Sequence, residues 1–248
     1  MHVVAVIQAR MGSSRLPGKV MLPLAGEHVL THDVRRVDAA GAVDKTVVAT
    51  STGKQDDIVT RYADRAGADV FRGSETDVLA RMFQAAGEAD ADIVVRVTAD
   101  CPLVVPEAVD AVVDRLRESK ADYASTNVNR TLPRGLGAEA FTYTSFKQVA
   151  AEAETPFERE HVTPRYHQNP NQFDVKTVTS EAVFASEDYR DRTDLRLTLD
   201  EADDYELLRT VYEGVEWDGD QLLDARDAID YIDENDLAEI NSNVEQKT

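Results

Sequence analysis

The 248-residue chain has one cysteine, Cys101, and no purely apolar run longer than the stretch from Val3 to Ile7. A lone cysteine excludes an intramolecular disulfide and a thiol-rich metal site. The apolar stretch is far shorter than the roughly 18 residues that a membrane helix needs, and the N-terminal region lacks a cationic flank followed by a long apolar segment. We therefore expect a cytoplasmic protein without a membrane span.

Positive charge is also scarce. The chain has 27 Lys+Arg against 47 Asp+Glu, a formal net charge of −20, and only 7 of the basic residues are lysine. A field of this sign repels nucleic acid and anionic membranes, so we expect neither as a partner. The acidic residues are spread along the chain, which favours an acidic, halophilic-type protein from a salt-rich cell interior. An ordinary acidic protein is the alternative.

Apolar, β-branched runs alternate with stretches of helical spacing in the first half of the chain. Strands are predicted at residues 2–7, 45–50, 69–72 and 92–98, and helical spacing appears in the segments that contain Val29 to Val37 and Val78 to Phe83. Because buried parallel strands read as continuous apolar runs, the pattern predicts an α/β fold with a parallel sheet. In such folds, ligands bind outside the carboxyl ends of the strands.

The pattern changes from Asn127 onward. Residues 127–180 are interpreted as an inserted lid or acceptor-binding subregion on the same sheet, with strands near 138–143 and 173–178. A strand-like segment at 195–200 follows, and then acidic amphipathic segments around 205–212 and 222–232. No repeat or low-complexity linker interrupts the chain, so residues 1–248 are predicted to form one domain.

A basic loop, Gln8 to Lys19, follows the first predicted strand directly. Three cations are interleaved with small residues in it: Arg10, Arg15 and Lys19 among Gly12, Ser13, Ser14 and Gly18. Glycines let backbone N–H groups approach a phosphate, arginines grip its oxygens in a fork, and lysine supplies a movable charge. The loop therefore predicts a triphosphate site, and a merely solvated basic loop is the alternative.

Two better-known phosphate motifs do not match this loop. A Walker A loop has four residues between its glycines and a hydroxyl residue after its lysine, whereas five residues separate Gly12 from Gly18 and Val20 follows Lys19. The G-x-G-x-x-G array of dinucleotide-binding turns is absent as well. The loop must hold phosphate in another way.

The loop resembles the opening signature of the sugar nucleotidyltransferases, in particular the cytidylyltransferases that make CMP-activated acidic sugars. Within the acylneuraminate/KDO cytidylyltransferase-like superfamily, it is most similar to the spore coat polysaccharide biosynthesis (SpsF) type. Further stretches agree in order: Val48-Ala-Thr-Ser51, Val70-Phe-Arg-Gly-Ser-Glu75 with Asp77, Arg96-Val-Thr-Ala-Asp-Cys-Pro102, Pro133-Arg-Gly-Leu136, Glu158-Arg-Glu-His-Val-Thr-Pro164 and Arg196-Leu-Thr-Leu-Asp200. The resemblance runs from residue 3 to about residue 213.

The resemblance implies a Rossmann-like, mostly parallel sheet of the nucleotide-diphospho-sugar transferase (GT-A-like) type, in which the opening loop wraps CTP. Arg10, Arg15 and Lys19 are then the catalytic cations on the β- and γ-phosphates and the departing pyrophosphate. The implied nucleotide-binding residues lie in the loop and at the ends of the next strands: Gln8, Ala9, Gly12, Ser13, Thr50, Ser51, Arg72, Gly73, Ser74 and Asp77.

The resemblance also implies a Mg²⁺ cofactor on Asp100 and Asp200. Each aspartate follows a β-type segment, where its carboxylate can supply hard oxygen ligands in the shared crevice. A helix N-cap is the alternative for Asp200, and an Asx-turn is the alternative for Asp100.

For the acceptor, the resemblance implies an acidic sugar bound by residues of the later subregion: Arg134, Glu139, Arg159, His161 and Arg165. Surface ion pairs are the alternative for the arginines, since acids outnumber bases. The family pattern commonly continues with Asp after Pro133-Arg-Gly-Leu136, whereas this chain has Gly137, so a contact to the acceptor is expected to differ. A homodimer through about residues 127–180 is a further expectation from the resemblance.

The predicted function is a Mg²⁺-dependent cytidylyltransferase that transfers CMP from CTP to an acidic sugar, with release of pyrophosphate, for surface polysaccharide or glycan assembly. A glycosyltransferase of the same fold is one alternative, although Asp90-Ala-Asp92, which has the Asp-x-Asp spacing usual in that class, precedes its strand. A catalytically inactive nucleotide-binding partner is the other. The nucleobase and the identity of the sugar remain open from the sequence.

Overall fold

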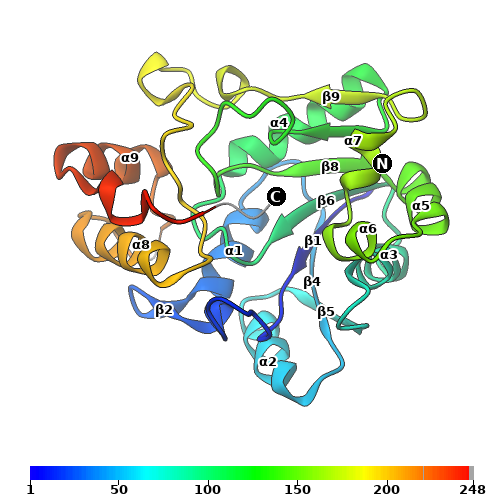
Figure 1. Cartoon of the computed structure of the whole chain (residues 1–248), viewed down its shortest axis with the longest axis horizontal. Helices are drawn as coiled ribbons and strands as arrows, with labels where there is room; N and C mark the ends of the chain where they lie inside the picture. Colours follow the sequence, from blue (N-terminus) through cyan, green and yellow to red (C-terminus); the bar gives the residue numbers. More distant parts are fainter. Residues whose placement is uncertain (220, 246–248) are drawn as a thin grey trace.

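The predicted β-branched runs form the centre of a seven-stranded sheet. The computed structural model describes residues 1–219 and 221–245. In it, β1 (Val3–Gln8), β4 (Lys45–Ser51), β5 (Asp69–Gly73) and β6 (Ile93–Thr98) run parallel in the order β5-β4-β1-β6 (Figure 1). Each of the four strands predicted in the first half of the chain lies within a residue or two of an observed one, because runs of apolar, β-branched residues mark strands of a covered parallel sheet.

The sheet continues beyond β6 with three short strands in the order β8-β7-β9. These are β7 (Tyr123–Ser125), β8 (Glu139–Thr142) and β9 (Val175–Thr177). β8 is antiparallel to β6 and to β7, whereas β7 and β9 are parallel. A small hairpin of β2 (Pro23–Leu24) and β3 (Glu27–His28) lies outside this sheet. The predicted α/β class with a mostly parallel sheet is confirmed.

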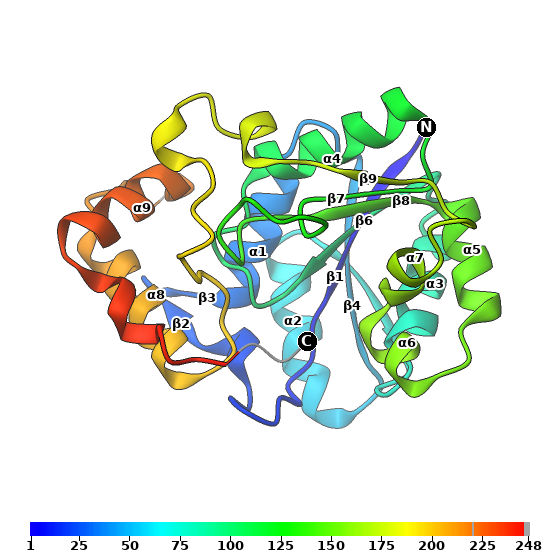
Figure 2. The ribbon, with the colours of Figure 1, turned by 45° about the horizontal axis from the view of Figure 1, so that its top comes forward.

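Helices cover both faces of the sheet (Figure 2). One face is covered by α1 (Val29–Asp38), α2 (Asp57–Arg65) and α4 (Pro106–Ser119). The other is covered by α3 (Val78–Glu88), α5 (Tyr143–Glu152), α6 (Pro156–His161) and α7 (Pro164–Gln168). Short 3-10 turns occur at Lys19–Met21, Lys54–Asp56, Ser180–Ala182, Glu187–Tyr189 and Leu237–Asn241.

Strand β1 shows how the sequence produces these layers. Val3, Ala5 and Ile7 pack into the core beneath α1, α2 and α4, while Val4 and Val6 pack into the core beneath α3 and α5. All five side chains are fully buried. Successive strand residues point to opposite faces, so this continuous apolar run serves two cores at once.

The C-terminal region adds a third core alongside α1. It contains α8 (Ala202–Gly214) and α9 (Ala225–Glu234), which lie together at one side of the molecule (Figure 1). Each helix overlaps a predicted acidic amphipathic segment: α8 extends beyond 205–212 at both ends, and α9 begins and ends later than 222–232. No helix in the described part of the chain is long and apolar enough to cross a membrane.

The expectation of a strand at 195–200 is wrong. This segment is extended, but it forms only an isolated parallel bridge between Arg196 and Arg134. Its alternation is nevertheless real, because Leu195, Leu197 and Leu199 pack into the C-terminal core while Asp200 lines a pocket. The alternation arises because one side of this extended segment is buried and the other faces the pockets. Such an arrangement does not require hydrogen bonding to neighbouring strands.

Candidate active site

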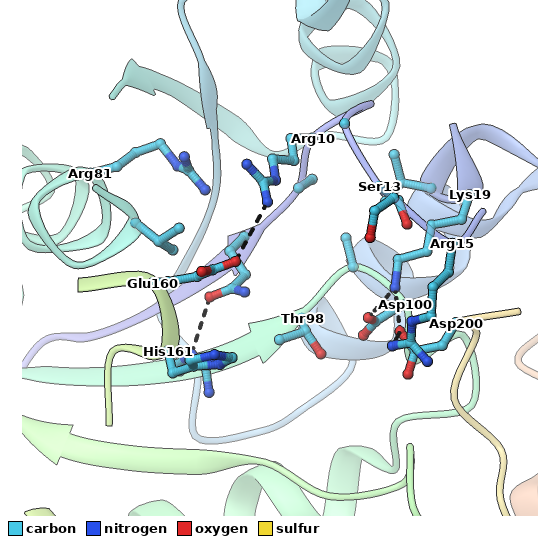
Figure 3. Close-up of a pocket in the computed structure, with 18 residues that line it drawn as sticks. Arg10, Ser13, Arg15, Lys19, Arg81, Thr98, Asp100, Glu160, His161 and Asp200 are labelled. Atoms are coloured by element: carbon cyan, nitrogen blue, oxygen red, sulfur yellow. Dashed lines mark hydrogen bonds and ion pairs between the residues drawn. The ribbon is translucent and has the colours of Figure 1, made fainter. Parts of the chain in front are cut away.

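A pocket of about 350 Å³ opens at the carboxyl ends of β1 and β6 (Figure 3). The loop after β1 forms one of its walls. This loop turns back on itself because the Gly18 N–H donates to the Met11 carbonyl oxygen at 2.9 Å, and Gly18 takes a φ of 73°. The Met11 N–H donates to Asp56 Oδ1 at 2.7 Å, which ties the loop to the end of β4.

Lys19 lies at one end of this pocket, between two carboxylates. Its Nζ donates to Asp100 Oδ2 at 2.6 Å, to Asp200 Oδ1 at 2.9 Å and to the Leu199 carbonyl oxygen at 2.8 Å. Burial opposes the charged form, but the two carboxylates outweigh it and raise the pKa of Lys19 to about 12. The predicted cation and both predicted metal ligands therefore meet at one point.

Asp200 is bound by further cations. Arg15 Nη2 lies 3.0 Å from its Oδ1, and Arg196 Nη2 lies 2.7 Å from its Oδ2. Burial alone would raise the pKa of Asp200, yet Lys19, Arg15 and Arg196 together lower it to about 2. The N-cap alternative for Asp200 fails, because the capping box of α8 is made by Glu201 and Asp204.

The donor set fits a hard divalent cation in part. Asp100 and Asp200 present oxygens that converge on one cationic atom, and carboxylate oxygens are the ligands that Mg²⁺ prefers. No group of three or more His, Cys, Asp or Glu residues among residues 1–219 and 221–245 is arranged to hold a metal. A metal at this pair would therefore need phosphate oxygens and water to complete its shell.

The opposite end of the pocket is formed by Arg10, Arg81, Glu160 and His161 (Figure 3). Arg81 is only 2% exposed and makes no ion pair in the described structure. Its Nη1 donates to the Ser74 carbonyl oxygen at 2.5 Å, whereas its buried Nε and its Nη2 have no hydrogen-bond partner among the residues that the structure describes. Burial, with the charge of Arg10, lowers the pKa of Arg81 to about 10.

The sequence analysis missed Arg81. It lies in α3 among the apolar residues Leu79 and Met82 of a buried face. An arginine inside an apolar helical stripe was the available signal, because such a side chain is almost never fully buried without a partner. Arg81 lines the open first pocket, where a bound ligand would supply the missing partner.

The predicted nucleotide-binding residues separate into two groups. Gln8, Ala9, Gly12 and Ser13 line the pocket. The other six lie behind its walls and contact the protein itself: Thr50, Ser51, Arg72, Gly73, Ser74 and Asp77. Asp77, for example, caps α3 and forms an ion pair with Arg159 at 2.8 Å. The second group thus shapes the pocket from outside in this structure.

A second pocket, of about 230 Å³, adjoins the first and shares Asp100 and Asp200 with it. Arg134 and Glu139 line it, as predicted for the acceptor site. Glu139 accepts from Arg96 Nη1 at 2.6 Å and from the Tyr123 hydroxyl at 2.7 Å. Burial would raise the pKa of Glu139, but Arg96 and these hydrogen bonds lower it.

The remaining predicted acceptor residues lie elsewhere. His161 lines the first pocket rather than the second. Arg159 pairs with Asp77, and Arg165 pairs with Glu152 at 2.9 Å and Glu158 at 3.0 Å. The ion-pair alternative therefore describes the contacts of Arg159 and Arg165 in this structure.

The unusual Gly137 also lines the second pocket. A Cβ at this position would collide with the hydroxyl of Thr126, which accepts from the Ala138 N–H at 3.1 Å. Any larger side chain here would have to displace Thr126. The pair Thr126 and Gly137 thus provides a compact wall where the family pattern has an aspartate.

Comparison with known proteins agrees with this geometry. A family model described as cytidylyltransferase matches residues 4–235. An uncharacterized protein of Methanocaldococcus jannaschii is 34% identical over 249 residues, covering 100% of this chain and 98% of that protein. The spore coat polysaccharide biosynthesis protein SpsF of Bacillus subtilis is 31% identical over 216 residues, covering 85% and 86%.

Two further comparisons extend this result. A 3-deoxy-manno-octulosonate cytidylyltransferase of Yersinia pseudotuberculosis is 34% identical over 174 residues, covering 64% of this chain and 66% of that enzyme. The solved structure of a cytidylyltransferase from Leptospira borgpetersenii superposes with a TM-score of 0.86 at 31% identity, covering 100% of both chains. The family match spans nearly the whole fold, including the basic loop at residues 8–19 and both aspartates, and the chain belongs to the cytidylyltransferase family.

Proposed function

We propose that this cytidylyltransferase transfers CMP from CTP to a hydroxyl of an acidic sugar and releases pyrophosphate. One observation carries the proposal: Lys19, Asp100 and Asp200 meet where two adjoining pockets share a wall. A nucleotide in the first pocket and a sugar in the second would place the attacked phosphorus at this junction. Such a shared point is what a two-substrate transfer requires.

The loop cations supply the electrostatics of the transfer. Charge accumulates on the non-bridging and leaving oxygens as the sugar hydroxyl attacks the α-phosphorus, so positioned cations dominate catalysis. Arg15 and Lys19 lie at the shared end of the first pocket, and Arg10 lies at the other end. Lys19 leaves the carboxylate pair to contact the phosphates when the nucleotide binds.

We propose Mg²⁺ as the cofactor, held by Asp100 and Asp200 together with the nucleotide. Mg²⁺ usually keeps several waters and binds through one or two carboxylates plus substrate phosphates, which matches the two carboxylates present. When bound, the ion neutralises negative charge on the phosphates. The protein's own part is to hold the Asp200 carboxylate in place through Arg15 and Arg196.

Arg81 is proposed to select cytosine. The guanidinium donates hydrogen bonds only, and Nη2 is the nitrogen left for a ligand in the first pocket. Cytosine presents two adjacent acceptors, O2 and N3, whereas uracil carries a hydrogen on N3. A donor aimed at that edge therefore accepts cytosine and meets a competing donor on uracil.

An acidic acceptor is proposed from the second pocket. Arg134 lines it without a carboxylate partner within 4.0 Å among the described residues, so it is available to a substrate carboxylate. The names of the relatives support this: one makes spore coat polysaccharide, and another acts on 3-deoxy-manno-octulosonate, an acidic sugar. Surface polysaccharide or glycan assembly is the proposed pathway class.

Pyrophosphate release tests the proposal. Purified protein is incubated with Mg²⁺, one nucleoside triphosphate and a panel of acidic sugars, each beside its neutral counterpart. We expect release with CTP and an acidic sugar only. A glycosyltransferase would instead consume a nucleotide-sugar without releasing pyrophosphate, and an inactive partner would bind CTP without turnover. Either result would overturn the proposal.

The structure does not support the glycosyltransferase alternative. Asp92 immediately precedes β6, at the end of the strand away from the pocket, and its Oδ2 accepts from the His2 N–H at 2.7 Å. A diphosphate in the pocket would be far from this aspartate along the strand. Asp92 of the Asp-x-Asp motif therefore binds a backbone N–H of the chain itself.

The proposed assembly is a cytoplasmic homodimer. Residues 1–248 would act as one nucleotidyltransferase domain, with residues 127–180 as the acceptor-binding and dimer-forming subregion. Within that stretch, Glu139–Thr142 forms β8 in the central sheet, so a partner bound there would be mechanically linked to the second pocket. Sedimentation at working concentration tests the dimer, and a monomer would contradict it.

A further inference from the structure

A third pocket, of about 160 Å³, lies beyond the second one and shares Arg134 with it. Its lining is rich in arginine: Arg130, Arg134 and Arg196 all contribute. The hydroxyl residues Thr193 and Ser242 line it as well. Three arginines around so small a space are unexpected in a chain whose net charge is −20.

Only one of the three arginines is neutralised. Arg196 pairs with Asp200 at 2.7 Å and with Asp204 at 2.8 Å. Arg130 and Arg134 have no carboxylate within 4.0 Å and no side-chain hydrogen bond among the described residues, and the buried Nε of Arg130 has no partner. Two half-buried cations thus face a pocket without a counter-ion.

The electrostatic strain of this arrangement is visible in both side chains. Burial, followed by the charges of Arg130 and Arg196, lowers the pKa of Arg134 to about 10. Burial and the charge of Arg196 also lower the pKa of Arg130. Unpaired cations held close together in a partly dry site are costly, and a bound anion would remove the cost.

The acidic residue in the lining does not fill this role. Asp194 is engaged by Arg192, whose Nη2 lies 3.0 Å from its Oδ2, and Arg192 pairs in addition with Asp233 at 2.7 Å. The hydrogen bonds from Arg192 lower the pKa of Asp194. The charge of Asp194 is therefore balanced by Arg192 and does not neutralise Arg130 or Arg134.

We propose that Arg130 and Arg134 form an oxyanion subsite, beside the acceptor pocket, for a phosphate or carboxylate group. Two guanidinium groups match the planar edges of such a group, and hydroxyls can donate to its remaining oxygens. If the bound anion is a second acidic group of the acceptor sugar, the subsite rests on the proposed function. Arg134, which lines both pockets, would then contact both acidic groups of that sugar. A free phosphate would bind by the same chemistry.

The first measurement uses inorganic phosphate and needs no turnover. Phosphate is titrated calorimetrically at constant ionic strength, set with KCl, into protein saturated with CTP and Mg²⁺ but given no acceptor, so that the first pocket is filled. If a free anion uses the subsite, wild type binds phosphate and Arg130→Gln binds it at least tenfold more weakly. Arg209→Gln is the control, because Arg209 is exposed and its one ion pair within the described part of the chain is with Glu213 at 3.8 Å.

The second measurement separates the two sources of the anion. KM is determined for a sugar with one carboxylate and for a sugar that also carries a phosphate. If the acceptor supplies the anion, Arg130→Gln raises KM for the doubly acidic sugar at least tenfold and leaves KM for CTP and for the singly acidic sugar unchanged. Arg130→Lys should restore part of the loss.

The two measurements together decide the inference. Failure of the phosphate titration and of the KM effect would overturn the subsite. Absence of any turnover would instead contradict the transfer reaction, while an Arg130-dependent phosphate affinity would still support the subsite. The two failures are therefore distinguishable.

Discussion

Lys19 is the residue that balances the two carboxylates of the site. Its ammonium holds together two carboxylates, Asp100 and Asp200, that would otherwise repel each other. A divalent cation and the ammonium cannot both occupy that position. In the proposed mechanism, the same side chain neutralises the pair before nucleotide binding and becomes free for the phosphates afterwards.

Replacing Lys19 by methionine should separate its two roles. We expect Lys19→Met to lower turnover by about 10²- to 10³-fold, because a preorganised cation is lost. Without nucleotide, the same variant should bind Mg²⁺ or Mn²⁺ more tightly than wild type, since the carboxylate pair is no longer neutralised. Steady-state kinetics and metal titration measure the two effects. Lys54→Met, at an exposed position, is the control, and unchanged turnover in Lys19→Met would refute the assignment.

Arg81 gives a second test at this scale, through nucleobase preference. The ratio of kcat/KM for CTP to that for UTP should fall roughly 10- to 100-fold in Arg81→Gln, the range expected for loss of one charged hydrogen bond. A ratio is insensitive to the fraction of folded protein, which matters because Arg81 is buried. Arg61→Gln, on the exposed side of α2, should keep the wild-type ratio. An equal ratio in Arg81→Gln would place the base elsewhere.

At the scale of elements, the extended segment 195–200 and the loop that carries Arg134 depend on each other. The Arg134 N–H donates to the Leu195 carbonyl oxygen at 3.2 Å, and the Leu197 N–H donates to the Arg134 carbonyl oxygen at 2.7 Å. Gly135 follows with a φ of 100° and packs directly on the backbone of Leu197. This contact joins the wall of the second pocket to the segment that ends in Asp200.

Gly135→Ala should therefore destabilise the protein strongly. Its new Cβ would collide with the Leu197 backbone, which cannot move aside as a flexible side chain would. Gly67→Ala is a matched control, because Gly67 has a similar φ of 95° but nothing within 4 Å of its Cβ position. Strain at positive φ costs about 1–3 kcal/mol in both variants, and overpacking adds about 1–3 kcal/mol at Gly135 alone. Equal losses in urea unfolding would show that this contact is not tight.

At the scale of the whole molecule, self-repulsion among the acidic residues opposes folding. With 47 acidic against 27 basic residues, most excess charge has no partner of opposite sign. The Debye length falls from about 10 Å at 0.1 M salt to about 3 Å at 1 M. At 1 M salt, the repulsion even between neighbouring surface charges is therefore screened.

The melting temperature should accordingly rise by at least about 5 °C between dilute buffer and molar KCl, which corresponds to roughly 1–2 kcal/mol for a chain of this size. A triple variant, Glu88→Gln/Glu118→Gln/Glu206→Gln, removes three exposed charges and should melt higher in dilute buffer with a smaller salt dependence. Calorimetry in a KCl series measures both. A flat melting temperature would remove the halophilic interpretation.

The sequence alone determined the parallel centre of the sheet and the basic, glycine-containing loop that follows the first strand. Strands β1, β4 and β6 are mostly buried on both faces, and this local requirement is met by consecutive apolar residues, whereas the edge strand β5 is only half-buried. The prediction of a strand near 173–178 is confirmed by β9, whereas the three-residue strand β7 carries too little pattern to be found, because its pairing partners are distant segments. The basic loop was visible because its glycines and cations are neighbours in the chain.

Only the tertiary structure decided which charges meet. Lys19 is 81 residues from Asp100 and 181 from Asp200, so their convergence depends on the register of separate segments around the sheet edge. The unpaired state of Arg81, Arg130 and Arg134 is likewise a property of surroundings that no local pattern encodes. Residue type determines what chemistry is available, and long-range packing determines which groups come close enough to perform it.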